Sequence, residues 1–233
     1  EDGQPWDLSD PKKREKAKRI IREQQPELIV VCPMCGPFAS WMQVNYTKVS
    51  EKEVRQKLYE ALKHLKFALE ICKEQHEAGR LFVFEHPVQA TSWGTRMMKR
   101  ILNMSEVEAV NFDFCSLGMR TTDEAGNDVA AKKRTKVATN SGHIAAALRK
   151  CQCRRDHVHG HLTAGRPKAC QVYPKDFCEL IIRGLKREIE DREWLDRVYK
   201  KIDATKSVEK LMSLCQSLEA PKDDEGEQQE LLK

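Results

Sequence analysis

A thiol and a carboxylate that each follow an apolar run are the side chains of this 233-residue chain with the clearest capacity for chemistry. Cys35 lies in a Pro- and Gly-containing turn after residues 28–31, and Glu85 directly follows residues 81–84. A thiol in a turn at a strand end becomes a nucleophile when cations or helix N-termini favour its thiolate. If both runs are neighbouring strands, Cys35 and Glu85 form one site; an inert buried thiol is the alternative.

A second group of reactive side chains lies in a Gly-, His- and Arg-rich stretch after residue 150. Thiolate and imidazole are ligands of tetrahedral zinc, and we predict a Zn²⁺ that is structural rather than catalytic. Cys153, His157 and His161 are spaced by four, so a helical turn would bring them to one face. In an extended segment His157, His159 and His161 would instead share a side. Contacts with phosphate groups are the alternative role of these histidines. The predicted ligands are Cys151, Cys153, His157 and His161.

The 9 cysteines are odd in number and unevenly spaced, which argues against a secreted disulfide scaffold and favours reduced thiols in an intracellular compartment. Cys32 and Cys35 form a C-x-x-C pair, a spacing typical of half a zinc site or of a redox pair. Because no second C-x-x-C completes such a site, we favour the nucleophile for Cys35. No apolar run approaches the roughly 20 residues that span a bilayer, so we expect no membrane partner.

Basic side chains are concentrated outside the C-terminal tail. The formal net charge is +5, but residues 219–233 carry −4 and residues 1–218 carry +9. A basic folded region fits a polyanion such as nucleic acid, and solvated helix faces are the alternative. Phosphate contacts dominate nucleic-acid affinity, whereas amide side chains can bind base edges. The predicted nucleic-acid contacts are Gln43, Lys132, Lys136, Arg154 and Arg155.

Short apolar runs alternate with helical patterns along the first 150 residues. Strands are predicted at residues 28–31, 81–84, 107–112 and 135–139, and helices at 10–24, 50–79, 93–102, 140–149 and from 174 onward. This alternation predicts an α/β fold with a mostly parallel, doubly wound (Rossmann-like) sheet and C-terminal helices. We expect a core at residues 1–150, a Cys/His loop and helices packed on it at 151–218, and a disordered acidic tail at 219–233.

Residues 28–40 resemble the catalytic segment of the cytosine-5 DNA methyltransferases, in which a hydrophobic strand runs into a Pro-Cys loop closed by Phe-Ser. Phe84-Glu85-His86-Pro87 is similar to that family's Glu-Asn-Val segment, with the glutamate retained. Residues 132–138 resemble its Gln-x-Arg-x-Arg segment, and Trp6-Asp7 lies where the family has an acidic residue near its cofactor. A looser resemblance is to a methyltransferase-like module of retroelement-type polyproteins, which implies a larger polyprotein or assembly.

The resemblance implies a methyltransferase-type sheet and a defined reaction. The Cys35 thiolate would attack C6 of a flipped cytosine while Glu85 contacts N3, and C5 would take a methyl group from S-adenosylmethionine. Arg134 would steady the base or its phosphate, and Asp7 and Pro33 would line the cofactor site. DNA in the nucleus is then the expected partner, in preference to RNA.

Two departures from the family pattern favour a different function. Met34 replaces the proline that directly precedes the family's cysteine, and no Gly-x-Gly occurs to cradle the cofactor. The resemblance therefore implies either that the cofactor half precedes Glu1 or that the site is degenerate. The alternative function is a non-catalytic, metal-stabilised nucleic-acid-binding or assembly module that keeps the methyltransferase fold.

Overall fold

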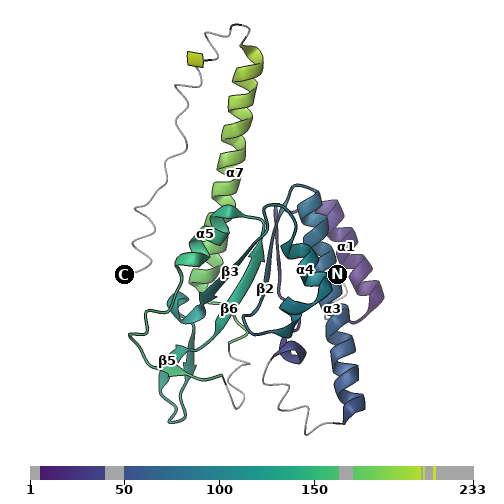
Figure 1. Ribbon diagram of the computed structural model, residues 1–233, viewed down its shortest axis with the longest axis vertical. Coiled ribbons are helices and arrows are strands. Elements are labelled where there is room, and N and C mark those ends of the chain that lie inside the picture. Colours follow the sequence, from purple (N-terminus) through teal and green to yellow (C-terminus); the bar gives the residue numbers. More distant parts are fainter. Residues whose placement is uncertain (1–5, 40–49, 163–169, 206, 208–211, 214–233) are drawn as a thin grey trace.

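The computed structural model describes residues 6–39, 50–162, 170–205, 207 and 212–213. A main sheet lies between two helical layers, and one long helix extends beyond it (Figure 1). The helices are α1 (Pro11–Gln24), α3 (Glu51–Glu77), α4 (Arg96–Leu102), α5 (Gly142–Lys150) and α7 (Lys175–Ala204), with short 3₁₀ helices η1 (Gly36–Phe38), η2 (Thr91–Gly94) and η3 (Phe114–Leu117). The strands are β1 (Leu28–Val31), β2 (Leu81–Pro87), β3 (Glu108–Asp113), β4 (Arg120–Thr122), β5 (Asp128–Ala131), β6 (Arg134–Thr139) and β7 (His159–Gly160).

The main sheet is mixed, with strand order β1-β2-β6-β3, so the expectation of a mostly parallel, doubly wound sheet is wrong. β1 pairs with β2 in parallel, but β6 pairs antiparallel with both β2 and β3. The second sheet, of order β4-β5-β7, is also mixed, because β4 and β5 are antiparallel whereas β5 and β7 are parallel. The Rossmann-like arrangement is therefore not the fold of the described residues.

The connection between β3 and β6 decides the direction of β6. A parallel neighbour requires a crossover, usually a helix, that carries the chain back to the edge from which it started. Between Asp113 and Arg134 the chain instead forms η3, β4 and β5, and it re-enters the sheet so that these two residues pair. Gly126, with φ of +87°, lies within this excursion.

Alternation along the strands divides the core between the two faces of the main sheet. Val83 and Val137 belong to the cluster that the sheet forms with α5 and α7, which includes Phe177. Phe84 and Ala138, one residue further along each strand, belong to the cluster formed with α3 and α4. The face on which each candidate side chain lies therefore follows from its position in the strand.

The helices predicted to start near residues 10, 50 and 140 begin there, each at a capping side chain. Asp10 accepts a hydrogen bond from the backbone of α1, and Ser50 forms a capping box at α3 with Glu53. Ser141 caps α5, and its hydroxyl also donates to Glu188 of α7 at 2.6 Å, which ties the two helices together. Within the described ranges, no helix is both long enough and apolar enough to cross a membrane.

Candidate functional site

Four potential metal ligands converge beside the end of β3. Cys115 lies in η3, directly after β3, whereas Cys153, His157 and His159 come from the segment between α5 and the end of β7. Their ligand atoms all lie within 4.8 Å of one another, so this group, which we call the Cys/His cluster, could hold a metal ion. The fold thus brings together two segments that are far apart in the sequence.

The spacing inside the Cys/His cluster is close to that of tetrahedral coordination. The Sγ atom of Cys153 lies 3.6 Å from Nε2 of His157 and 3.4 Å from Nε2 of His159, and the two Nε2 atoms are 3.0 Å apart. Ligand atoms about 2.0–2.3 Å from a tetrahedral Zn²⁺ lie roughly 3.3–3.8 Å from one another. The donor atoms of Cys153, His157 and His159 therefore fit the ion in type and, within a few tenths of an ångström, in spacing, and Sγ of Cys115 lies within 4.8 Å of each of them.

Hydrogen bonds around the Cys/His cluster orient its ligands. Nδ1 of His157 lies 2.8 Å from the carboxylate of Asp156, so this nitrogen donates and leaves the Nε2 lone pair free for a metal. The backbone N–H of Arg155 donates to Sγ of Cys153 at 3.3 Å, which holds this sulfur in place. Arg155 has a φ of +60°, so the chain turns here through a left-handed conformation. Partners of this kind fix ligand orientation in protein metal sites.

Asp113 anchors this loop to the end of β3. Its backbone N–H donates to the carbonyl of Cys151 at 2.9 Å, and its carboxylate accepts from the backbone N–H of Cys153 at 3.1 Å. Gly160 allows the far end of the loop to approach β4 and β5, because a Cβ atom there would lie 2.5 Å from Cγ2 of Thr121. The loop is therefore held at both ends by the protein itself.

Two of the potential ligands have shifted pKa values. Burial and the neighbouring Cys153 thiol raise the pKa of Cys115 to about 12. Desolvation, followed by the neighbouring His157 and Lys132, lowers the pKa of His159, which keeps its imidazole neutral at neutral pH. Neutral imidazole is the form that binds metals, and a divalent cation deprotonates a coordinating thiol.

Cys153 and His157 are the predicted ligands that the Cys/His cluster contains, whereas Cys151 and His161 lie outside it. Cys151 is buried in the core, where its thiol donates to the carbonyl of Ala147 at 3.5 Å. His161 is exposed beyond the end of β7. The segment is not helical here, so the residues spaced by four do not meet on one face. In the extended segment, alternate residues lie on the same side, and His157 and His159 therefore meet in the cluster.

Cys115 is the potential ligand that sequence reasoning missed. It follows β3 as Cys35 follows β1, whereas Glu85 lies within the last residues of β2. The argument from strand ends that selects Cys35 and Glu85 would also have selected Cys115 if it had been applied to every predicted strand.

The structure brings Cys35 close to Glu85 at the ends of β1 and β2, in a group that we call the thiol site. β1 and β2 are parallel neighbours, with Val31 opposite Phe84. Burial and then the nearby Glu85 carboxylate raise the pKa of the Cys35 thiol. Cys35 is therefore protonated at neutral pH, and a nucleophilic role requires that its proton be removed during the reaction.

One carboxylate oxygen of Glu85 has a partner and the other has none. The Tyr173 hydroxyl donates to Oε2 at 2.7 Å, whereas Oε1 is buried and has no hydrogen-bond partner among the described residues. Tyr173 is also hydrogen-bonded to Cys32, a thiol whose pKa is raised by burial to about 11. A buried oxygen without a partner is costly, which is typical of a site that a ligand completes.

His86 holds the loop that carries Cys35. Its Nε2 lies 3.0 Å from the carbonyl oxygen of Pro33, and its Nδ1 lies 2.7 Å from the hydroxyl of Ser92. Because the carbonyl can only accept, Nε2 donates and Nδ1 accepts from Ser92. Desolvation lowers the pKa of this fully buried histidine to about 4. Pro33, which the resemblance places in a cofactor site, thus uses its carbonyl to fix the loop.

Arg134 and Lys136 lie on the face of the main sheet opposite Glu85. Lys136 lies opposite His86 in the pairing of β2 with β6, so its side chain is on the same face as that of His86 and on the other face from Glu85. Arg134, two residues before Lys136, lies on the same face as Lys136. Arg134 is exposed at the start of β6, with its Nε 3.9 Å from a carboxylate oxygen of Asp113. The structure therefore places Arg134 beside the residue that anchors the Cys/His loop, and not in the thiol site.

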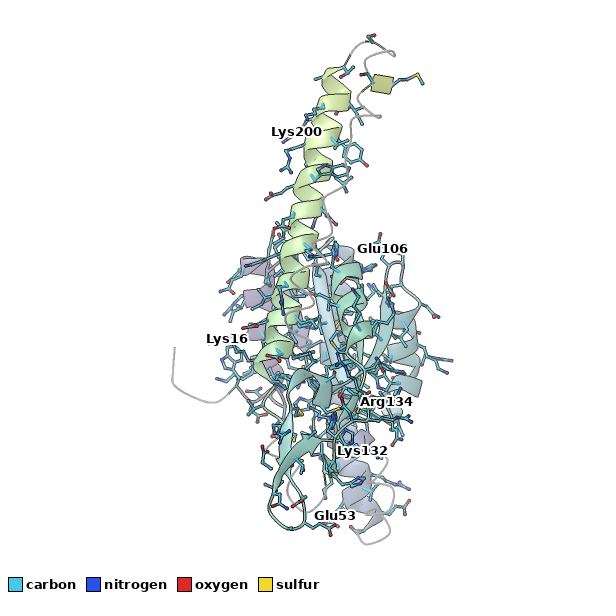
Figure 2. The ribbon with its side chains drawn as sticks, turned by 90° about the vertical axis from the view of Figure 1, so that its left-hand side faces the viewer. Lys16, Glu53, Glu106, Lys132, Arg134 and Lys200 are labelled. Carbon is cyan, nitrogen blue, oxygen red and sulfur yellow. The ribbon has the colours of Figure 1, made fainter. Side chains whose placement is uncertain are left out.

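Exposed basic side chains surround the Cys/His cluster. Lys132 interacts electrostatically with His159, and Figure 2 shows it on the same part of the molecule as Arg134. Arg154 and Arg155 are exposed within the loop itself. Four of the residues assigned to the predicted catalytic and nucleic-acid-binding sets thus lie around one potential metal site.

The remaining predicted residues lie elsewhere. Asp7 accepts a hydrogen bond from the backbone of Ser9 at 2.8 Å, and this bond lowers its pKa. The Ser9 hydroxyl lies 3.0 Å from His64 of α3, so Asp7 belongs to the layer formed by α1 and α3. Gln43 lies outside the described residues.

Comparisons of the chain with protein-family models, with curated proteins and with solved structures find no match.

Proposed function

We propose that this chain is a nucleic-acid-binding module whose basic loop is organised by a structural Zn²⁺. The convergence of four ligand atoms in the Cys/His cluster is the observation that carries the proposal. Two thiols and two imidazoles occupy all four tetrahedral positions with protein atoms, which is typical of structural zinc. Mg²⁺ and Ca²⁺ prefer oxygen ligands, and the thiols favour a softer ion. The proposed ligands are Cys115, Cys153, His157 and His159.

The ion would join η3 to the loop that carries Arg154 and Arg155. Side chains on a restrained loop lose less conformational entropy when they bind than those on a free one. Lys132 and Arg134 extend the positive surface, and the charge of +9 on residues 1–218 adds a long-range attraction to phosphates. A phosphate backbone is therefore the ligand that this surface suits best.

The basic helix α1 provides a comparison, because part of its charge is neutralised inside the protein. Lys18 pairs with Glu70 of α3 at 2.7 Å. Arg22 pairs with Glu74 of the same helix at 2.9 Å. Arg19 lies on α1 with 68% of its side chain exposed and serves as a matched control for the arginines of the loop.

Fluorescence anisotropy with a labelled DNA duplex and an RNA duplex of the same sequence, measured at several salt concentrations, tests this proposal. We expect Arg155→Ala and Lys132→Ala each to weaken binding and to reduce the slope of log K against log salt by about 1. Arg19→Ala should leave binding unchanged, and removal of zinc should weaken it. DNA is expected to bind more tightly than RNA. Equal losses from Arg19→Ala and Arg155→Ala would contradict the proposal.

The proximity of Cys35 to Glu85 supports a second candidate function. We propose that the thiol site would carry the transfer of a methyl group from S-adenosylmethionine to C5 of cytosine. Cys35 would lose its proton to solvent, bond transiently to C6, and be released when the C5 proton leaves to solvent and the S–C bond breaks. The unpartnered Oε1 of Glu85 would contact N3 of the base. The cofactor would supply the methyl group when bound. Because the Rossmann-like sheet is not the fold of the described residues, this proposal rests on the thiol site alone.

Calorimetry with S-adenosylmethionine and a methyl-transfer assay on DNA test the second candidate. We expect Cys35→Ala to abolish transfer while retaining cofactor binding. Cys178→Ala, which alters an exposed thiol on α7, should have no effect. If the protein binds nucleic acid but no S-adenosylmethionine, the second candidate is wrong and the first is retained.

A further inference from the structure

The two thiols of the Cys/His cluster lie next to each other although they come from different segments. Cys115 belongs to η3 and Cys153 to the loop after α5, and their side chains share a hydrogen bond. Both are partly exposed, whereas Cys72, Cys151 and Cys170 are buried. The pair thus combines mutual contact with access to solvent, so a small oxidant can reach two neighbouring thiols.

We propose that Cys115 and Cys153 form an oxidation switch, in which a hydroperoxide converts the pair to a disulfide, expels the zinc ion and releases the basic loop. This inference rests on the proposed zinc-dependent binding of nucleic acid. It adds a regulatory modification site to that function.

The chemistry balances with a hydroperoxide as the oxidant. Zinc-bound cysteines are thiolates, which are the reactive form. One thiolate attacks the peroxide, the O–O bond breaks, and a sulfenic acid forms; the second thiolate then attacks this sulfur to form the S–S bond. The two thiolates lose two electrons in total, and hydrogen peroxide takes these up with two protons from solvent to give two molecules of water. Zn²⁺ leaves because only two imidazoles remain to bind it.

The disulfide would tether a shorter part of the loop to η3 than the zinc ion does. Cys153 would stay beside η3, where the Asp113 carboxylate already binds its backbone N–H. His157 and His159 would lose the ion that joins them to η3. The residues after Cys153, including Arg155, would therefore be less restrained, while the main sheet and its helices remain folded. Oxidation should accordingly lower nucleic-acid affinity without unfolding the protein.

The C-x-x-C pair of the thiol site is the competing target for the oxidant. Residue Cys32 is exposed and Cys35 partly exposed, and the two thiols interact electrostatically. They are not part of the Cys/His cluster, and although the residues reach the surface, the atoms around each sulfur desolvate it and favour the protonated form, which reacts slowly with peroxide. A zinc-bound thiolate pair should therefore be oxidised first.

The experiment treats the zinc-loaded full chain with a small excess of hydrogen peroxide and measures released zinc with a chromogenic chelator. We expect one zinc ion released per chain and a disulfide that joins the tryptic peptides 101–120 and 151–154. Fragment spectra must assign the bond to Cys153 and not to Cys151, which shares the second peptide. DNA affinity should fall to that of the chelator-treated protein, and a dithiol reductant with added zinc should restore it.

Cys115→His provides a variant that keeps a zinc ligand at this position but cannot form the disulfide. We expect it to retain zinc and DNA binding in peroxide, whereas Cys178→Ser should respond as the unmodified chain does. Retention of zinc and DNA binding by the unmodified chain in peroxide, or a Cys32–Cys35 disulfide formed while zinc stays bound, would overturn the switch alone. A chain that binds no zinc, or binds zinc but no nucleic acid, would instead contradict the proposed function.

Discussion

The hydroxyl of Tyr173 donates a 2.7 Å hydrogen bond to Oε2 of Glu85, and it joins the segment before α7 to the end of β2. Tyr173 also stacks on Phe114, with ring centroids 5.6 Å apart, and Phe114 is the residue directly before the zinc-site candidate Cys115. The thiol site and the Cys/His cluster are therefore connected through adjacent, packed side chains. The positions of both depend on how the chain after β3 returns, as β6, to pair with β2.

Tyr173→Phe should destabilise the protein, because it removes a hydrogen bond to a buried carboxylate whose other oxygen has no partner among the described residues. We expect the free energy of unfolding to fall by about 1–3 kcal/mol in urea titrations. Tyr199→Phe, on an exposed part of α7, is the control and should be neutral. A loss no larger than that of the control would argue against a structural role for the Tyr173 hydroxyl.

His86 should titrate far below the ordinary pKa of histidine. Its pKa is about 4 in the folded protein against an ordinary value of 6.5, so the unfolded chain takes up this proton first as the pH falls. The stability that neutral His86 contributes, about 3 kcal/mol, is fully present above pH 6.5 and is lost as the pH falls to about 4. NMR titration of the His86 ring measures this directly, and a midpoint near 6.5 would contradict the buried, neutral histidine.

Zinc content should follow the structural ligand set and not the set predicted from the sequence. We expect Cys115→Ser and His159→Asn to lose the ion, because each removes a donor atom from the Cys/His cluster. Cys151→Ser and His161→Asn should retain one zinc per chain, since neither residue belongs to the cluster. Elemental analysis of the purified variants distinguishes the two sets, and loss of zinc from Cys151→Ser with retention in Cys115→Ser would reverse the assignment.

Gly184→Ala should separate α7 from α5. A Cβ atom at this position would lie 2.5 Å from Cγ1 and 3.2 Å from the Cα atom of Ile144, so one of the helices must move. We expect a loss of about 1–3 kcal/mol from overpacking, although alanine by itself favours a helix over glycine by about 1 kcal/mol. Gly142→Ala, at the start of α5 with open space around it, is the control for thermal unfolding and should be neutral or slightly stabilising.

Local sequence signals were sufficient for the positions of most elements. Asp10, Ser50 and Ser141 mark helix starts because a capping side chain bonds to backbone groups within three residues of itself. The apolar runs that became β1, β2, β3 and β6 are short and bounded by turns or helix signals. The proximity of Cys35 and Glu85 also followed from the sequence, because a helix between two strands carries the chain back to make them parallel.

Only the tertiary structure decided how the distant parts meet. The direction of β6, and with it the face on which Arg134 lies, depends on the path of the chain between Asp113 and Arg134, where the short strands β4 and β5 carry weak local signals. The ligand set likewise depends on Cys115 meeting a loop that follows α5 in sequence. The sequence by itself therefore determined which side chains could bind a metal or act as a nucleophile, whereas the path of the chain through the mixed sheet determined which of them come together, because contacts between distant segments depend on the whole fold and not on neighbours in sequence.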